Sequence, residues 1–216
     1  MTALNYKLFP EEIIVAMDTL ATSPDDKLPY SYVTKFVILP HLKTVIAGTG
    51  HTGMLSFWFN HVNWDLNAQT IDQLDKITPN TLQKKIVNRN EKDLPSTTIY
   101  YFGYSEENNE HVGFRYRSIE NWVSQKLPYS FGYKPEISKS IIEGLCNNGS
   151  GIKKFMIDLM IEQQKADNRL AISEKVGIGG DICLIYIKKE QIVTFPIYRF
   201  KSYDSDLALM PQGGSE

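Results

Sequence analysis

One stretch of the sequence decides how we expect this chain to fold: Ile13-Ile14-Val15-Ala16-Met17-Asp18, five apolar residues followed by a carboxylate. A short continuous apolar run is typical of a strand that is buried on both faces. Residues 3–9 alternate between apolar and polar side chains, which is the pattern of a half-buried strand. Pro10-Glu11-Glu12 separates the two segments, so we predict that they pair as a hairpin with Asp18 at its far end.

The remaining sequence alternates between blocks of strands and blocks of helices. A polar loop is predicted at 19–31, followed by strands at 33–39, 44–47, 97–104, 111–118, 181–188 and 191–199. Helical patterns cover 54–62, 79–90, 136–146 and 151–167. Segregated blocks favour an α+β fold in which two sheets pack between helix layers. We expect one domain at 1–203 and a loose tail at 204–216.

Composition narrows the function classes. The 216 residues are 42% hydrophobic and 22% charged, which is typical of a single globular domain. A net charge of −2 argues against nucleic acid as a partner, and no apolar run is long enough for a membrane span. Cys146 and Cys183 do not form a disulfide framework, so a reducing cytoplasm is expected. The four histidines lack metal-ligand spacing, and neither a metal nor a cofactor is expected.

Thr2 directly follows Met1 and is a candidate nucleophile. If Met1 is removed, one residue carries both a hydroxyl, which can attack, and a free amine, which can accept its proton. A free α-amino group has a pKa of about 7.7–8.0, so much of it is neutral near neutral pH. The alternatives remain open, because many chains begin with Met-Thr by chance and Asp18 could simply end a strand. Lys35 in an apolar segment needs a partner, which Asp18 would supply.

An ordered set of segments resembles a known superfamily. These segments are Thr2, residues 14–22, 33–36, 46–50 and 180–183. Together they resemble the Ntn-hydrolases, and more closely the proteasome β subunits and the bacterial HslV-type proteases. The resemblance implies a four-layer αββα sandwich and assembly into homo-oligomers, with a ring as one possibility.

The resemblance also implies a role for each matched residue. Thr2 would be the nucleophile, Lys35 would place an ammonium beside it, and Asp18 would pair with Lys35. The Gly48 N–H would stabilise the developing oxyanion, and Thr22 would lie where an extended peptide binds by main-chain hydrogen bonds. The implied reaction is hydrolysis of a peptide or another amide through an ester on Thr2.

Two positions before the late strand are among those that depart from the pattern of the family. Lys175 stands where family members have a supporting Asp, and Ile178 where many have Ser. These departures keep a second function open, namely a catalytically inactive member with an assembly or binding role. A hydrolase of small amides is a third possibility, because function resides in the site and not in the fold.

Overall fold

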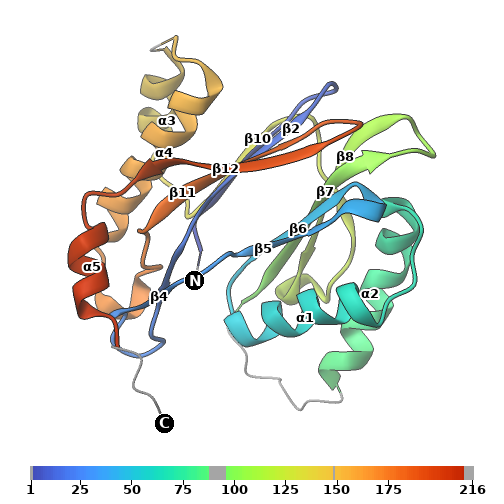
Figure 1. Ribbon diagram of the computed structural model, residues 1–216, viewed down its shortest axis with the longest axis horizontal. Helices are drawn as coiled ribbons and strands as arrows, with labels where there is room; N and C mark the ends of the chain where they lie inside the picture. Colours follow the sequence, from blue (N-terminus) through green and yellow to red (C-terminus); the bar gives the residue numbers. More distant parts are fainter. Residues whose placement is uncertain (1, 88–95, 148, 212–216) are drawn as a thin grey trace.

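The computed structural model describes residues 2–87, 96–147 and 149–211 (Figure 1). Within these residues the strands form three sheets, and all strand pairs are antiparallel. The first sheet has the order β10 (Phe131–Lys134), β1 (Leu4–Leu8), β2 (Ile13–Asp18), β11 (Asp181–Ile187) and β12 (Ile192–Arg199). The second has the order β5 (Phe36–Leu39), β6 (Thr44–Thr49), β7 (Thr98–Ser105), β8 (Glu110–Arg117) and β9 (Gln125–Lys126). The third is the ribbon of β3 (Leu20–Thr22) and β4 (Pro29–Tyr32).

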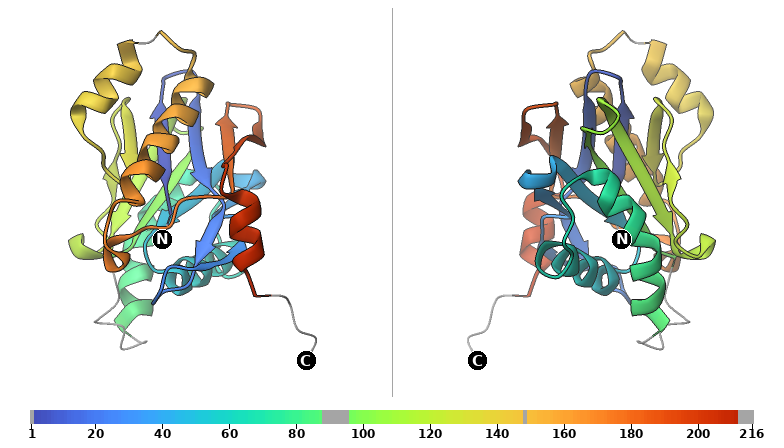
Figure 2. Two further views of the ribbon diagram at one scale, coloured as in Figure 1. Left: turned by 90° about the vertical axis from the view of Figure 1, so that its left-hand side faces the viewer. Right: turned by 90° about the vertical axis from the view of Figure 1, so that its right-hand side faces the viewer.

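In the described residues, five α-helices lie outside the two large sheets. They are α1 (Thr52–Trp64), α2 (Ile71–Val87), α3 (Lys139–Asn147), α4 (Ile152–Asp167) and α5 (Tyr203–Leu209). The two views of Figure 2 show α1 and α2 on one side of the molecule and α3, α4 and α5 on the other. Among the described residues, none of the helices is both long and apolar enough to cross a bilayer.

The β1–β2 hairpin predicted from the sequence is confirmed, and β2 is the central strand of its sheet. Val15 and Met17 point into the core between the two large sheets, where they join residues of β6 and β7 such as Val45. Ile14 and Ala16 point the other way, into the core under α4. Because both faces of β2 are buried, its sequence is apolar at every position before Asp18.

The predicted four-layer αββα sandwich is wrong. The structure is mostly antiparallel sheet, with three sheets and five helices in its described part, and the helices do not form two complete outer layers. α1 and α2 cover the second sheet, but on the other side α4 alone contributes fully buried residues to the core. α3 has no buried residue and packs on α4, and α5 lies beside β4.

Several local predictions also fail. α2 begins at Ile71, so Pro79 lies inside the helix and not in its first turn as predicted. The early start is stabilised by Ile71, Leu74 and Leu82, which are buried in the core beneath the helix. The last three residues of the predicted helix, 88–90, lie outside the described residues.

Other predictions fail in segments close to the candidate active site described below. The predicted loop at 19–31 contains the β3–β4 ribbon, and the strand predicted at 33–39 begins only at Phe36. Residues 204–209, which the sequence analysis assigns to a tail, form α5 together with Tyr203. The Tyr203 ring stacks on Tyr32 of β4, with ring centroids 4.3 Å apart.

Candidate active site

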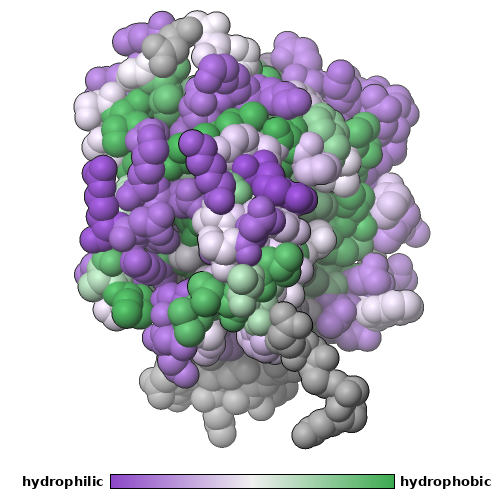
Figure 3. Space-filling model, turned by 60° about the vertical axis from the view of Figure 1, so that its left-hand side comes forward, coloured by the Kyte–Doolittle hydropathy of each residue, from purple (hydrophilic) through white to green (hydrophobic). Residues whose placement is uncertain are grey.

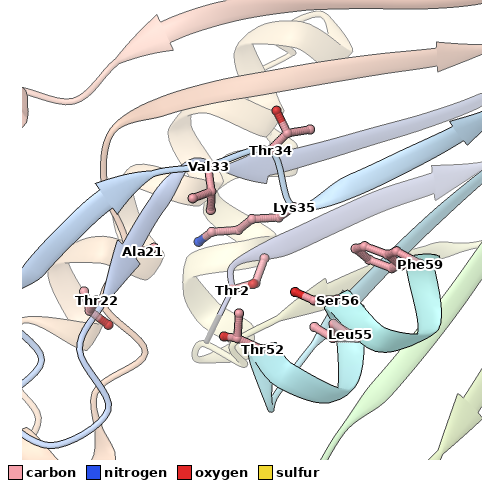
Figure 4. Close-up of a pocket in the computed structure, with 10 residues that line it drawn as sticks. All are labelled: Thr2, Ala21, Thr22, Val33, Thr34, Lys35, Thr52, Leu55, Ser56 and Phe59. Atoms are coloured by element: carbon pink, nitrogen blue, oxygen red, sulfur yellow. The ribbon is translucent and has the colours of Figure 1, made fainter. Parts of the chain in front are cut away.

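A pocket of about 170 Å³ opens where Thr2, the β3–β4 ribbon and α1 meet (Figure 4). Its walls come from four segments: Thr2 ahead of β1, strand β3, the link between β4 and β5, and the first turns of α1. The lining residues are Thr2, Ala21, Thr22, Val33, Thr34, Lys35, Thr52, Leu55, Ser56 and Phe59. Figure 4 shows Thr2 between Lys35 on one side and the α1 side chains on the other.

A buried ion pair lies behind the pocket. The Nζ of Lys35 is 2.9 Å from both carboxylate oxygens of Asp18, and the two side chains are almost completely buried. Asp18 Oδ1 also accepts the N–H of Ala3 at 2.9 Å, and the Asp18 N–H donates to the Ala3 carbonyl at 3.4 Å. Asp18 therefore fixes both Lys35 and the backbone of the residue that follows Thr2.

Burial shifts the pKa of both Asp18 and Lys35 away from the ordinary value. Loss of hydration raises the pKa of the Asp18 carboxyl, and the charge of Lys35 opposes this shift. The same loss of hydration lowers the pKa of the Lys35 ammonium, opposed by Asp18. A lysine with a lowered pKa, held beside a hydroxyl, can exchange a proton with its surroundings more readily than an exposed lysine.

The structure brings together most of the residues that the sequence singles out. Thr2, Lys35 and Thr22 line one pocket, and Asp18 holds Lys35 from behind. Gly48 is in β6 and does not line the pocket, although it lies directly behind a residue that does. A Cβ at Gly48 would lie 2.2 Å from Leu55 Cδ2, so only glycine allows this close packing. Met1, whose removal the proposed chemistry requires, lies outside the described residues.

The sequence analysis missed the contribution of α1. Thr52, Leu55, Ser56 and Phe59 are spaced i, i+3, i+4 and i+7, so they share one helix face, and that face borders the pocket. Two of the four carry hydroxyls, which is unusual for a face that also carries Leu and Phe. This mixed pattern was the signal in the sequence that could have identified them.

The segment with the two departures is part of the site's support. Ile178 is buried in the core under α4, and its carbonyl accepts a hydrogen bond from Gln164 Nε2 at 2.9 Å. The neighbouring Gly179 N–H points to Asp18 Oδ2 at 3.4 Å. The segment therefore contributes a backbone N–H, that of Gly179, to Asp18. Within the described residues, no group of three or more His, Cys, Asp or Glu side chains could hold a metal ion.

Comparison with known proteins shows which fold this is. No family model and no curated protein matches the sequence. Solved structures do match. "Anbu (Gly-1) mutant from Hyphomicrobium sp. strain MC1" has a TM-score of 0.62 at 12% identity, covering 97% of this chain and 92% of that one. "Anbu (ancestral beta-subunit) from Yersinia bercovieri" has a TM-score of 0.59 at 9% identity, covering 96% and 91%.

These matches correct the resemblance drawn from the sequence. The two structural neighbours named above are Anbu proteins, a proteasome-like but distinct family, and no family model or curated protein supports the HslV-type assignment. At such low identity the likeness shows the fold alone. The chain therefore shares the fold seen in the Anbu structures.

Proposed function

We propose that this chain is an N-terminal threonine hydrolase that cleaves peptide or other amide bonds after removal of Met1. One observation carries the proposal: Thr2 lines a pocket together with Lys35, and Lys35 is bound to a buried Asp18 that also holds Ala3. A buried ion pair costs desolvation, so its place directly behind a candidate nucleophile favours a functional over a purely structural role.

The proposed chemistry needs only groups of this chain and water. The Thr2 Oγ attacks the carbonyl carbon of the substrate while the free amine of Thr2 accepts the hydroxyl proton. The amine then gives this proton to the leaving nitrogen as the C–N bond breaks, which leaves an ester on Thr2. Water, activated by the same amine, hydrolyses the ester and restores the hydroxyl. The Lys35 ammonium disfavours a second positive charge nearby, which keeps the amine neutral.

The test is labelling with a peptide epoxyketone, a probe that needs a hydroxyl and a free amine on one residue. Intact mass of the purified protein first reports whether Met1 is present. We expect loss of Met1 and a single adduct that maps to Thr2, and no adduct in Thr2→Ala. Thr194→Ala, which removes an exposed threonine of β12, is the matched control and should label like the wild type. An adduct that persists in Thr2→Ala would refute the proposal.

A second function is favoured by the two departures near Asp18. Lys175 and Ile178 replace a carboxylate and a hydroxyl that the resemblance leads us to expect, and the Ile178 side chain is buried in the core. A catalytically inactive protein with an assembly or binding role would tolerate both changes. Retained Met1 and no adduct in the labelling experiment would favour this alternative.

Self-assembly is part of the proposal in either case. One structural neighbour is described as a beta-subunit, and this chain exposes large apolar residues on several elements, among them Trp64, Val193 and Leu209. Figure 3 shows hydrophobic residues in small patches between hydrophilic ones on the face that it brings forward. We expect light scattering after size exclusion to give a multiple of the chain mass of 24.7 kDa. A monomer at all concentrations would contradict this part of the proposal.

A further inference from the structure

Asp167, the last residue of α4, is a buried carboxylate with no place in the chemistry described above. Its side chain faces residues 175–179, a segment without regular secondary structure, and not the pocket. Oδ1 accepts the N–H of Val176 at 2.7 Å, and Oδ2 accepts the N–H of Gly177 at 2.9 Å. Hydrogen bonds to a carboxylate are stronger than those between neutral groups, so this segment is held firmly at one point.

The same segment supports β3 from its other side. Gly177 has φ +78°, and a Cβ at this position would lie 2.5 Å from Thr22 Cγ2. Two residues further on, the Gly179 carbonyl accepts the N–H groups of Thr19 at 3.3 Å and Leu20 at 3.1 Å. Strand β3 therefore lies against residues 177–179, and its Thr22 end lines the pocket that contains Thr2.

β3 has few other means of holding its position. It is three residues long, and within the described part of the chain it pairs only with β4, in a register that shifts between Ala21 and Thr22. Two-stranded ribbons of this size are marginally stable without packing against other elements. The contacts from residues 177–179 therefore contribute a large share of what orders this wall of the pocket, and Asp167 orders those residues in turn.

We propose that Asp167 is a positioning residue that holds β3 ready to bind an extended peptide beside Thr2. The inference rests on the proposed function, and it narrows the substrate from any amide to an extended peptide. An extended ligand that adds to β3 by main-chain hydrogen bonds needs that strand in one place. A compact amide that contacts only the pocket next to Thr2 does not.

The test compares two probes on two variants. Asp167→Asn replaces one acceptor by an NH₂ group that faces the Gly177 N–H, and Asp158→Asn removes a carboxylate that is ion-paired with Lys154 on the same helix. The probes are a tetrapeptide epoxyketone and an epoxyketone with one amino acid. We expect Asp167→Asn to lose about tenfold in labelling rate with the tetrapeptide, since one charge-assisted bond is lost. The rate with the single-residue probe should stay within about twofold, and Asp158→Asn should change neither rate.

Other outcomes separate the possible failures. Equal loss with both probes, or a lower labelled fraction at unchanged rates, would mean that Asp167 only stabilises the fold and would overturn the inference. If Asp167→Asn does not fold, Gln164→Leu removes a neighbouring support of the same segment and should shift the ratio of the two rates in the same direction. An unchanged ratio in that variant would overturn the inference as well.

A wild-type protein that neither probe labels would refute the proposed function and not the positioning role. Amide hydrogen exchange then decides the latter. The amides of Thr19 and Leu20, which bind the Gly179 carbonyl, should exchange about tenfold faster in Asp167→Asn and at the wild-type rate in Asp158→Asn. Exchange that rises only at Val176 and Gly177 would show that the support does not reach β3.

Discussion

Replacing Lys35 by Met tests whether the buried pair behind the pocket is as tightly coupled as its geometry indicates. Met has a similar length and no charge, so the change removes the ammonium with little loss of packing. Asp18, of which 1% is exposed, keeps two backbone partners, the N–H groups of Ala3 at 2.9 Å and Gly179 at 3.4 Å. It loses two contacts of 2.9 Å to a full positive charge.

The expected magnitude follows from this loss. Removing one partner of a buried ion pair lowers the free energy of unfolding by about 3–5 kcal/mol, because the other charge stays buried without compensation. For a chain of this size, 1 kcal/mol corresponds to about 2–4 °C in Tm, so the midpoint should fall by roughly 6–20 °C. An exposed pair gives the contrast. Lys154→Met breaks the ion pair with Asp158 on the surface of α4 and should cost only about 0.2–0.5 kcal/mol.

The loss of stability in Lys35→Met should also depend on pH, and the direction of the pKa shift of Asp18 determines whether it grows or shrinks as the pH rises. Burial already raises the folded pKa of Asp18 above 3.8, and loss of Lys35 removes the charge that opposes this shift. Between the unfolded and the folded pKa, the folded chain binds a proton that the unfolded chain has released. The stability that Asp18 contributes in the variant is therefore greatest below its unfolded pKa and is lost as the pH rises through its folded pKa. The penalty of Lys35→Met should accordingly be larger at pH 7 than at pH 5.

Urea denaturation followed by tryptophan fluorescence measures these differences, since Trp58 and Trp122 are buried and report on the core. The double variant Asp18→Asn with Lys35→Met should lose less than the sum of the two single variants, because the second change removes a charge that the first has left unpaired. A cost of Lys35→Met below about 1 kcal/mol, or simple additivity in the double variant, would refute the reasoning.

Three further predictions concern the site and its surroundings. Labelling of the proposed nucleophile should decline in two steps on acidification, first as the Thr2 amine takes up a proton near its ordinary pKa of about 7.7–8.0, and then again at a pH above 3.8, the ordinary pKa of Asp, because protonated Asp18 no longer holds its lysine; a rate that is constant down to pH 4 would contradict this. Gly48→Ala should cost about 1–3 kcal/mol in urea denaturation and slow labelling, since the new methyl group displaces Leu55 into the pocket; wild-type values in both assays would count against it. Tyr101→Phe should cost about 1–3 kcal/mol, because its buried hydroxyl accepts the Trp58 Nε1–H at 2.9 Å; a neutral result in a thermal melt would show that this bond adds no stability.

The parts of the site that could be predicted are those for which one short segment of sequence already indicates burial or the need for a partner. The apolar run before Asp18 specifies a buried strand, and a buried Lys35 requires a carboxylate. Taken together, these two inferences predict an ion pair between Asp18 and Lys35. The structure contains this pair, with Lys35 Nζ 2.9 Å from both carboxylate oxygens. Thr22 also lines the pocket, but it was carried over from the resemblance and not from a local pattern, and its role in binding a peptide stays a prediction.

The parts that could not be predicted depend on contacts between distant segments. β3 and β4 are three and four residues long, and their sequences contain no alternation that distinguishes them from a loop. Their order comes from residues 177–179 on one side and from the Tyr203 ring on the other. The predicted number of layers was wrong for the same reason. A helical pattern in a sequence does not tell whether a helix such as α3 packs on a sheet or on another helix.

The proposed chemistry lies within the first 35 residues, yet the C-terminal half of the chain holds it in place. Gln163 of α4 exchanges two hydrogen bonds with Asn5 of β1, at 2.8 and 3.0 Å, and both side chains are fully buried. One turn further along, Asp167 fixes the segment whose Gly179 supports both β3 and Asp18. A single helix thus positions the strand that follows Thr2 and the strand that would bind the substrate. Conserving Thr2, Asp18 and Lys35 while changing these α4 side chains would give a protein that keeps the proposed nucleophile and loses the proposed peptide site. Sequence comparisons restricted to the N-terminal segment would not detect such a change.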